Sequence, residues 1–520
     1  LTLNGILSES PEDSLVATLN DIEVDYITDV VNFNAVNFKG QVSGSATLSA
    51  TTSDNPQLRA DIVVDNMHIQ GGRLGTGFIQ AFWNKDRNGI DLLGHIVDKD
   101  GAKTRTTDVS GYVAPASNQM DIQVDTHDTN AEFLNGFLSS TFRDIKGDCN
   151  GTIHIIGPLN DVNIVGDIST DVSLVLRATD TRYHINPEDS LHLRIHQFRF
   201  DDIRLSDDRG LGTATVNGTL SHRNMKNFAY DFNIGFDNIT VYDEKEFNSD
   251  KFLATVFVNG NLDLHGSDGH PLRMNADITP CKGSVFAYDA ATPDAISSSN
   301  FVEIREKPSS VLFADGSPIF PFEEGSTEKT ADDSGTGNKE YTGDIFFDIN
   351  INVTPDCEIK LRMDNVDDGY MTTVGNGTLL AHYHNKSPFT LNGDYQIESG
   401  KYRLYLQDII YRDLDIQPTS NVVFNGNPFD ATIPLLCHHT LNAVPLRDLT
   451  GGDSFSQNSK VKVICVLDIT GNLSNMNFGF DLQMPNVSDE TRQLVRSLIS
   501  TEEEMNMQMI YLLGLGRFYA

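Results

Sequence analysis

The chain has 520 residues, which is enough for several domains or for one extended architecture. Acidic residues outnumber basic ones by 73 to 38, and the formal charge of −35 repels phosphate backbones and anionic membrane surfaces, so nucleic-acid binding is not expected. The five cysteines are widely spaced and include no C-x-x-C pair, so we expect small buried side chains with at least one free thiol.

The chain begins with LTLNGILSES, without an initiator methionine, a signal peptide or an apolar run long enough to cross a membrane. We therefore expect it to be a piece of a longer protein.

A loose hairpin pattern recurs along the chain, starting at Gly44, Gly151, Gly260 and Gly377. Each copy has a glycine, a short strand of alternating apolar residues, a polar turn, and a return strand that ends near Ala-Asp or Gly-Asp. Together with frequent Asn-Gly turn signals, the pattern predicts meanders of antiparallel strands. Repetition of one hairpin favours an elongated stack of such units.

Apolar and polar residues alternate in the strands between the turns, which places the apolar side chains of each strand on one face. The alternation is clear in residues 228–236, 252–264, 345–353, 402–406 and 461–469. The candidate lining of an apolar face is Phe232, Ile234, Phe236, Val256, Val258, Leu262, Leu264, Ile345, Phe347, Ile349, Ile351, Val353, Tyr402, Leu404, Leu406, Val463 and Leu467.

One long segment, residues 290–341, interrupts this strand pattern. It is rich in Pro, Ser and acidic residues and cannot bury enough apolar surface to offset its ordering entropy. We predict a disordered insertion or linker there, between strand regions at 1–289 and 342–484.

The last residues, 485–520, change to a helical pattern. Ser488 is predicted to cap a helix, and a second helix is predicted to end at Gly514. The first helix carries one apolar side, made of Leu494, Val495, Leu498 and Ile499. The second helix has two possible capping boxes, Ser500 with Glu503 or Thr501 with Glu504.

A search for catalytic and metal-binding motifs finds none of the common ones: no H-E-x-x-H, G-x-S-x-G, phosphate-binding loop or calcium loop. His382 and His384 would share one face of a strand, but they lack an acidic or Cys partner nearby in sequence, so an ordinary surface role is favoured over a metal site. We expect no enzymatic activity, no metal and no cofactor.

Three architectures bury one face of each strand: a sandwich, a closed barrel, or an open curled sheet whose apolar face is covered by something else. Periodicity does not distinguish them. An exposed apolar face of this length would need a ligand.

The C-terminal passage MPNVSDETRQLVRSLISTEEEMNMQMIYLLGLGRFY (484–519) resembles the signature of the TamB family, and most closely that of its Bacteroidota branch. Hairpins such as GTIHIIGPLNDVNIVGDI, which starts at Gly151, are similar to its repeats. The resemblance implies an AsmA-like, bridge-like lipid transfer protein of the Gram-negative periplasm. It also implies an inner-membrane anchor before this segment and an Omp85-family outer-membrane barrel (TamA-like) after it.

The fold expected from pattern and resemblance together is all-β: an elongated, curled, mostly antiparallel sheet with an open groove and a short C-terminal helical segment. The favoured function is a conduit that carries phospholipid acyl chains along that groove, with the candidate lining residues facing the lipid. Three alternatives stay open. The lining residues are the core of a covered sandwich, the protein is an assembly factor for outer-membrane β proteins, or it is a secreted adhesin.

Overall fold

The computed structural model describes residues 1–26, 37–53, 57–100, 103–139, 141–223, 226–245, 252–289, 344–362, 370–406, 410–418, 420–450, 460–473 and 475–519. The strands in these ranges are mostly antiparallel, and the helices among them are short. The predicted all-β fold class is therefore confirmed. The predicted insertion at 290–341 lies outside the described residues.

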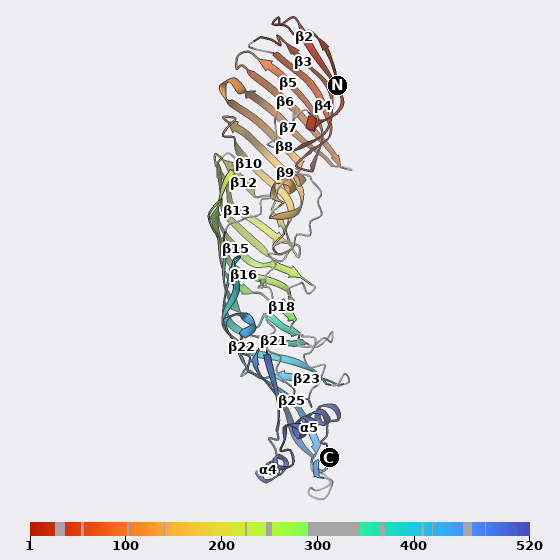
Figure 1. The fold of residues 1–520 in the computed structure, drawn as a ribbon, viewed down its shortest axis with the longest axis vertical. Helices are drawn as coiled ribbons and strands as arrows, with labels where there is room; N and C mark the ends of the chain where they lie inside the picture. The colour runs from red at the N-terminus through yellow and green to blue at the C-terminus, as the bar shows by residue number, and fades with distance from the viewer. Residues whose placement is uncertain are drawn as a thin grey trace. The chain divides into compact units, whose positions relative to one another are not determined.

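The chain, drawn as a ribbon in Figure 1, divides into two compact units by the contacts within it. Among the described residues, the first unit holds Leu1–Ile239, 261–274 and Asp344, and the second holds Thr240–Gly260, 275–289 and 345–519. The strands β15 (Lys226–Glu244), β16 (Phe252–Ser267) and β17 (Leu272–Pro280) contribute residues to both units. The predicted boundaries at 289, 342 and 485 stay predictions.

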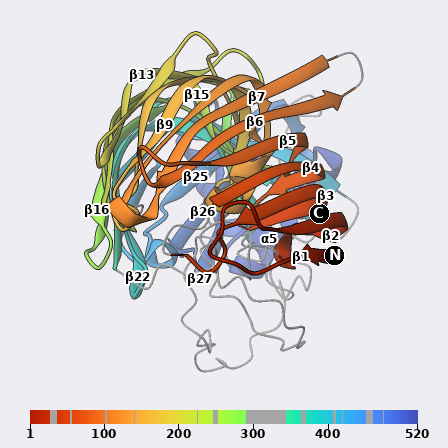
Figure 2. The same ribbon diagram turned by 90° about the horizontal axis from the view of Figure 1, so that it is seen from above.

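The first unit is an antiparallel meander in which most strands pair with their chain neighbours, and its strands arch rather than lie flat (Figure 2). The complete helical pieces of this unit in the described residues are η1 (Pro115–Ser117), η2 (Ala131–Phe133) and α2 (Leu134–Leu138). Its complete strands are β1 (Thr2–Gly5), β2 (Ser14–Glu23), β3 (Phe38–Ser49), β4 (Gln57–Ile69), β5 (Gly72–Asn84), β6 (Gly89–Asp100), β7 (Lys103–Ala114), β8 (Gln119–Asn130), β9 (Phe142–Gly157), β10 (Asn163–Leu176), β11 (Thr181–Ile185), β12 (Ser190–Arg194), β13 (Gln197–Asp207) and β14 (Thr213–Arg223).

The glycine that opens each predicted hairpin lies against the aspartate of the return strand. A Cβ on Gly151, whose φ is +147°, would lie 2.3 Å from the carbonyl oxygen of Asp167. Gly44 stands in the same relation to Asp61, also at 2.3 Å. A side chain cannot occupy that space, so glycine lets the two backbones approach closely and the sheet bend. The recurring Gly of the hairpins is therefore a packing requirement of the curved meander, whereas the Asp supplies only its backbone carbonyl to this contact.

The second unit contains a parallel strand pair, formed by β18 with β20, while the other pairings described in it are antiparallel. Its complete strands are β18 (Ser284–Asp289), β19 (Ile345–Val353), β20 (Cys357–Arg362), β21 (Tyr370–His384), β22 (Ser387–Leu406), β23 (Ile410–Ile416), β24 (Asn421–Gly426), β25 (Leu435–Pro445), β26 (Lys460–Asn472) and β27 (Asn475–Gln483). Its helices are η3 (Pro428–Asp430), α3 (Arg447–Thr450), α4 (Asp489–Leu498) and α5 (Glu502–Leu515).

Both C-terminal helices begin where the sequence predicts, but the second helix ends later than predicted. The Ser488 hydroxyl accepts from the backbone N–H of Thr491 at the start of α4. At the start of α5 the capping box uses Thr501 with Glu504. The predicted stop at Gly514 is wrong, because α5 continues to Leu515 and Gly516 takes the left-handed cap at φ 69°. A glycine within the last turn is tolerated, and the glycine that can adopt a positive φ ends the helix.

Candidate functional site

An unbroken apolar row crosses the sheet of the first unit. Neighbouring strands place one member each directly opposite the next, so all the side chains of the row point to the same side of the sheet. The row runs through Leu19, Gly44, Ile62, Ile79, Gly94, Val109, Val124, Ile153, Gly166, Leu193, Phe198, Leu220 and Tyr230. It has no charged residue and no interruption between β2 and β15. We call this side of the sheet the first apolar face.

The predicted lining residues of β15 lie on the first apolar face. Phe232, Ile234 and Phe236 pair with Gly218, Val216 and Ala214 on β14, in the same register as Tyr230. The Phe232 ring lies 5.1 Å from the ring of Phe200 in an edge-on arrangement. Two further candidates, Leu262 and Leu264, are half-buried on β16.

Much of the first apolar face is accessible. Ile62, Ile79, Val109, Val124 and Ile153 are all half-buried, although each belongs to a sheet interior. One margin is covered by the chain itself, where Phe133 of η2 packs on a cluster of buried residues. That cluster is Val42, Val64, Met67, Leu74 and Ile96. The centre of the face thus offers apolar surface that the described residues do not cover.

The other side of the same sheet is mostly polar, although it also carries the exposed apolar side chains Phe78, Phe82 and Leu93. One residue along from the apolar row, paired positions are occupied by His95 with Asp108 and by Asp167 with His192. The ring nitrogen of His95 lies 2.6 Å from a carboxylate oxygen of Asp108. Hydrogen bonds from His192 and then from Arg194 lower the pKa of Asp167. The sheet of the first unit therefore separates an apolar side from a mostly polar, charged one.

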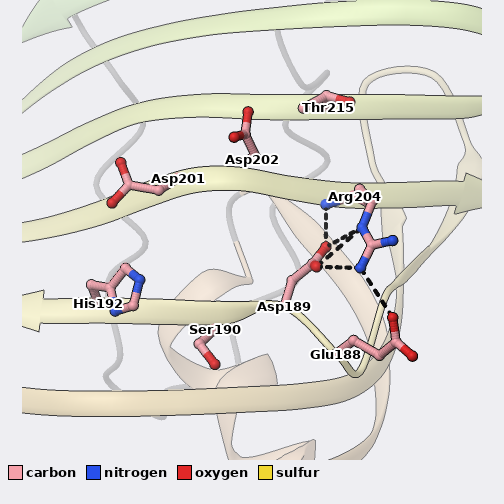
Figure 3. Close-up of a pocket in the computed structure, with 8 residues that line it drawn as sticks. All are labelled: Glu188, Asp189, Ser190, His192, Asp201, Asp202, Arg204 and Thr215. Carbon is pink, nitrogen blue, oxygen red and sulfur yellow. Dashed lines mark hydrogen bonds and ion pairs between the residues drawn. The ribbon is translucent and has the colours of Figure 1, made fainter.

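One pocket of the described residues lies on the polar surface (Figure 3). It has a volume of about 550 Å³ and sits where the strands β11 and β12, which both pair with β10, leave a break in the sheet. Its charged side chains are already engaged, since Arg204 donates to Asp189 at 2.6 Å and to Glu188 at 3.3 Å. The lining is Glu188, Asp189, Ser190, His192, Asp201, Asp202, Arg204 and Thr215. Such a lining does not suit an acyl chain.

Ion pairs gather at the strand ends beside η2. Arg105, largely buried, donates to Asp148 at 2.7 Å, and Lys103 donates to the same carboxylate at 2.5 Å. Burial opposes ionisation of Asp148, but the hydrogen bonds from Lys103 and Arg105 outweigh it and lower the pKa of this carboxyl. The same contact raises the pKa of Lys103. These opposite charges neutralise one another, and their ion pairs link the strand ends at this margin of the sheet.

Asp144 on β9 has a second pair of cationic partners. Lys146 lies 2.6 Å from one carboxylate oxygen, and Arg182 donates to the other. The hydrogen bonds from Lys146 and then Arg182 lower the pKa of Asp144 to about 2. This carboxylate is therefore ionised in the folded protein down to strongly acidic pH.

A second apolar face lies on the second unit. Ile351 pairs with Leu379, which pairs with Gly393, which pairs with Phe424. The register continues through Tyr402 with Leu414, Cys437 with Leu467, and Leu467 with Phe480. The predicted residues Phe347, Ile349, Ile351, Val353, Tyr402, Leu404, Val463 and Leu467 share this face, and Ile345 has the same strand parity. On β16, Val256 is half-buried and Val258 is fully buried. The side chain of Leu406 lies outside the described residues.

The second apolar face is covered at one end by the chain's own helix α5. There Tyr402, Leu404, Val463 and Leu467 are each at most 4% exposed. They belong to one cluster with Met509, Leu512 and Leu513 of α5 and Val495 of α4. Ile345, Phe347, Ile349 and Ile351 are half-buried instead. Whether any of these positions contacts lipid stays a prediction, but they now fall into a covered group and an accessible group.

Sequence reasoning did not select the lining residues of the first unit from β4 to β10. Their alternation is hard to see because glycines such as Gly94 and Gly166 occupy positions in the apolar row. The sequence signal for these lining residues is the recurring Gly and Asp of the hairpins, because the hairpin glycine occupies a position in the apolar row or close to it.

The candidate metal and thiol residues have ordinary structural roles. His382 bonds to Asp348 at 2.7 Å, and the His384 ring stacks on Phe346 at 4.4 Å. No group of three or more metal-binding side chains occurs among the described residues. All five cysteines are free, and four are buried, as expected from their spacing. Burial raises the pKa of the Cys437 and Cys465 thiols to about 12, so these are inert side chains.

The fold and its surfaces define a β-sheet protein that presents long apolar sheet faces backed by a charged surface. A family model for the TamB C-terminal domain matches residues 202–519, which is more than half of the chain. The chain belongs to the TamB family. A search of curated proteins gave no match.

Family membership supports a role in outer-membrane protein assembly or lipid transport in the Gram-negative envelope. At the level of the family, the partner is an outer-membrane protein of the TamA type. In the part of the chain that the structure describes, no helix has the length and apolar character needed to cross a bilayer.

Proposed function

We propose that this protein is a lipid-transfer conduit, in which phospholipid acyl chains lie on the apolar faces. The observation that carries the proposal is the row from Leu19 to Tyr230, which crosses 13 strands without a charged side chain and is half-exposed in its centre. The proposal extends to phospholipid moving between the inner and outer membranes through the periplasm. An inner-membrane anchor and an Omp85-family barrel would hold the two ends.

The energetics of transfer favour such a surface. An acyl chain loses about 0.8 kcal/mol per methylene group when it passes from hydrocarbon into water. A surface of Ile, Val, Leu and Gly removes that penalty without fixing the chain in one place, because these side chains make no directional bonds. Successive strands are about 4.8 Å apart, so 12 steps along the row give roughly 58 Å of apolar path. A conduit of this kind requires no catalytic group.

Site-specific photo-crosslinking tests the proposal directly. A photoreactive amino acid at Ile79 in the first unit or at Ile349 in the second should form adducts with phospholipid when the protein is expressed in a Gram-negative envelope. The control position is Gln80, the exposed neighbour of Ile79 on the opposite face of β5. Equal lipid adduct at Ile79 and Gln80 would contradict the proposal.

The same experiment separates the second candidate function, an assembly factor for outer-membrane β proteins. The observation that favours it is β27, which in the described residues pairs along one side, with β26. An unpaired strand side can accept a strand from another chain. Polypeptide adducts at Ile79 and Ile349, in place of lipid adducts, would favour the assembly factor over the conduit.

A further inference from the structure

The helix α5 and the residues after it form a self-contained hairpin, residues 502–519, which we call the α5 hairpin. The buried side chain of Gln508 donates to the carbonyl oxygen of Tyr519 and accepts from its N–H, both at 2.9 Å. The ring of Tyr511 lies 4.7 Å from that of Tyr519. The capping box of Thr501 and Glu504 satisfies the start of the helix. The hairpin therefore has polar contacts of its own that do not depend on the sheet.

The α5 hairpin lies on the end of the second apolar face (Figure 1). Its side chains Met509, Leu512, Leu513 and Phe518 are each at most 2% exposed. They share one cluster with Leu404 and other face residues, including Val463, Cys437, Cys465 and Leu467. The α5 hairpin thus covers the apolar sheet side chains that an acyl chain would contact if the hairpin were not there.

The helix α5 is more apolar than a fixed cover needs to be. A helix that permanently caps a core is usually polar on its outer side. The first turns of α4 fit this rule, with Asp489, Glu490 and Arg492, although Leu494 and Leu498 further along are 39% and 41% exposed. In α5, Leu515 is 63% exposed and Met507 is 39% exposed. After its three N-terminal glutamates, α5 therefore has apolar side chains on its outer side as well as against the sheet.

A polar contact joins the helix to the sheet at its C-terminal end. Arg412 of β23 donates from Nη2 to the carbonyl oxygen of Gly514 at 3.3 Å. A cation there also interacts favourably with the helix dipole. The neighbouring cation Arg403 has a different partner, Asp413 at 2.9 Å. The contact of Arg412 thus links α5 to the same strand that pairs with Tyr402 and Leu404.

We propose that the α5 hairpin is a displaceable plug at the end of the second apolar face, and that phospholipid acyl chains compete with it for that surface. The inference rests on the proposed conduit function. When an acyl chain replaces the α5 hairpin, apolar groups still cover the sheet side chains, so the hydrophobic free energy of the face changes little. The contacts within the hairpin survive displacement, whereas the contact from Arg412 to Gly514 is lost.

Distance measurement between two spin labels tests the plug. The labels are attached to Leu515→Cys on α5 and Asn477→Cys on β27, both at exposed positions. Cys281→Ser removes the half-buried native thiol, and the other four native thiols are buried. The probe is dioctanoyl-phosphatidylethanolamine, added in increasing amounts to the whole chain. We expect a second, longer distance population that grows with bound lipid, as quantified by mass spectrometry of the same samples.

Arg412→Ala should lower the lipid concentration at half-conversion by about 10- to 100-fold, the range expected for a lost hydrogen bond from a charged group. Arg403→Ala, the matched control, should leave it unchanged. Bound lipid with a single, unchanged distance would overturn the plug and leave the conduit standing. No bound lipid at any concentration would overturn both.

Discussion

A negative charge in the middle of the first apolar face should slow lipid transfer without unfolding the protein. Val109 is half-buried on β7 and lies directly between Gly94 and Val124 in the apolar row. In Val109→Asp the carboxylate keeps its water, because the side chain is accessible and has no reason to be desolvated. An acyl chain that crosses this strand then loses contact with the face.

The size of the effect follows from the spacing of the strands. One strand spacing of about 4.8 Å corresponds to roughly four methylene groups of an extended chain, and at about 0.8 kcal/mol each the barrier rises by roughly 3.2 kcal/mol. Since about 1.4 kcal/mol is a factor of ten in rate, transfer should slow by about 200-fold.

The assay is transfer of a fluorescent phospholipid between donor and acceptor vesicles by the purified chain. Ser110→Asp is the matched control, because Ser110 is the next residue on β7, also half-buried, and faces the polar side. We expect the Ser110→Asp protein to transfer lipid at the wild-type rate. Circular dichroism and thermal unfolding establish that both variants are folded. A folded Val109→Asp protein that transfers lipid at the wild-type rate would refute the reasoning.

Three further outcomes are expected. Leu467→Asp should destabilise the second unit by more than about 3 kcal/mol, because it buries an unpaired charge between Cys437 and Phe480, whereas Ile349→Asp at a half-buried position should stay folded; urea unfolding distinguishes them. Gly151→Ala should lower the melting temperature because its Cβ would overlap the next strand, and Gly235→Ala, with open space around it, should not. Asp144 has a folded pKa of about 2, so its stabilising contribution is complete above about pH 4 and is lost as the pH falls toward 2; Asp144→Asn should reduce that loss, measured as urea midpoints at pH 7 and pH 2.5, and an equal loss in both proteins would exclude it.

Period-two patterning was sufficient to predict the strands and to place candidates on common faces. Phe232 and Ile234 lie where the alternation put them, because side chains on a pleated strand have no other choice of side. The hairpin glycines were recognised as a repeat, but their close approach to an aspartate of the next strand requires coordinates. The end of α5 was placed at Gly514 and lies at Gly516, because two glycines compete and sequence does not show which one takes a positive φ.

Alternation along a strand does not predict what covers its apolar face, because the covering residues can lie far away in the chain. Ile349 and Leu404 have the same local pattern and lie on the same face, yet one is half-buried and the other is 4% exposed. The difference comes from α5, which is about a hundred residues away from Leu404 in the chain. After the capping box its sequence, MNMQMIYLLGL, is mostly apolar, which is typical of a helix with more than one apolar contact surface.

The difference in burial between Ile349 and Leu404 also shows that accessibility changes along the second apolar face. If every position were covered by protein, the sheet would be an ordinary core and charge would unfold it everywhere. If every position were accessible, charge would be tolerated everywhere and would block only transfer. The structure places accessible Ile345 and Ile351 at one part of the face and buried Val463 and Leu467, under α5, at another. Charge should therefore be tolerated better at Ile345 and Ile351 than at Val463 and Leu467, and a conduit along this face requires α5 to move away from the covered residues.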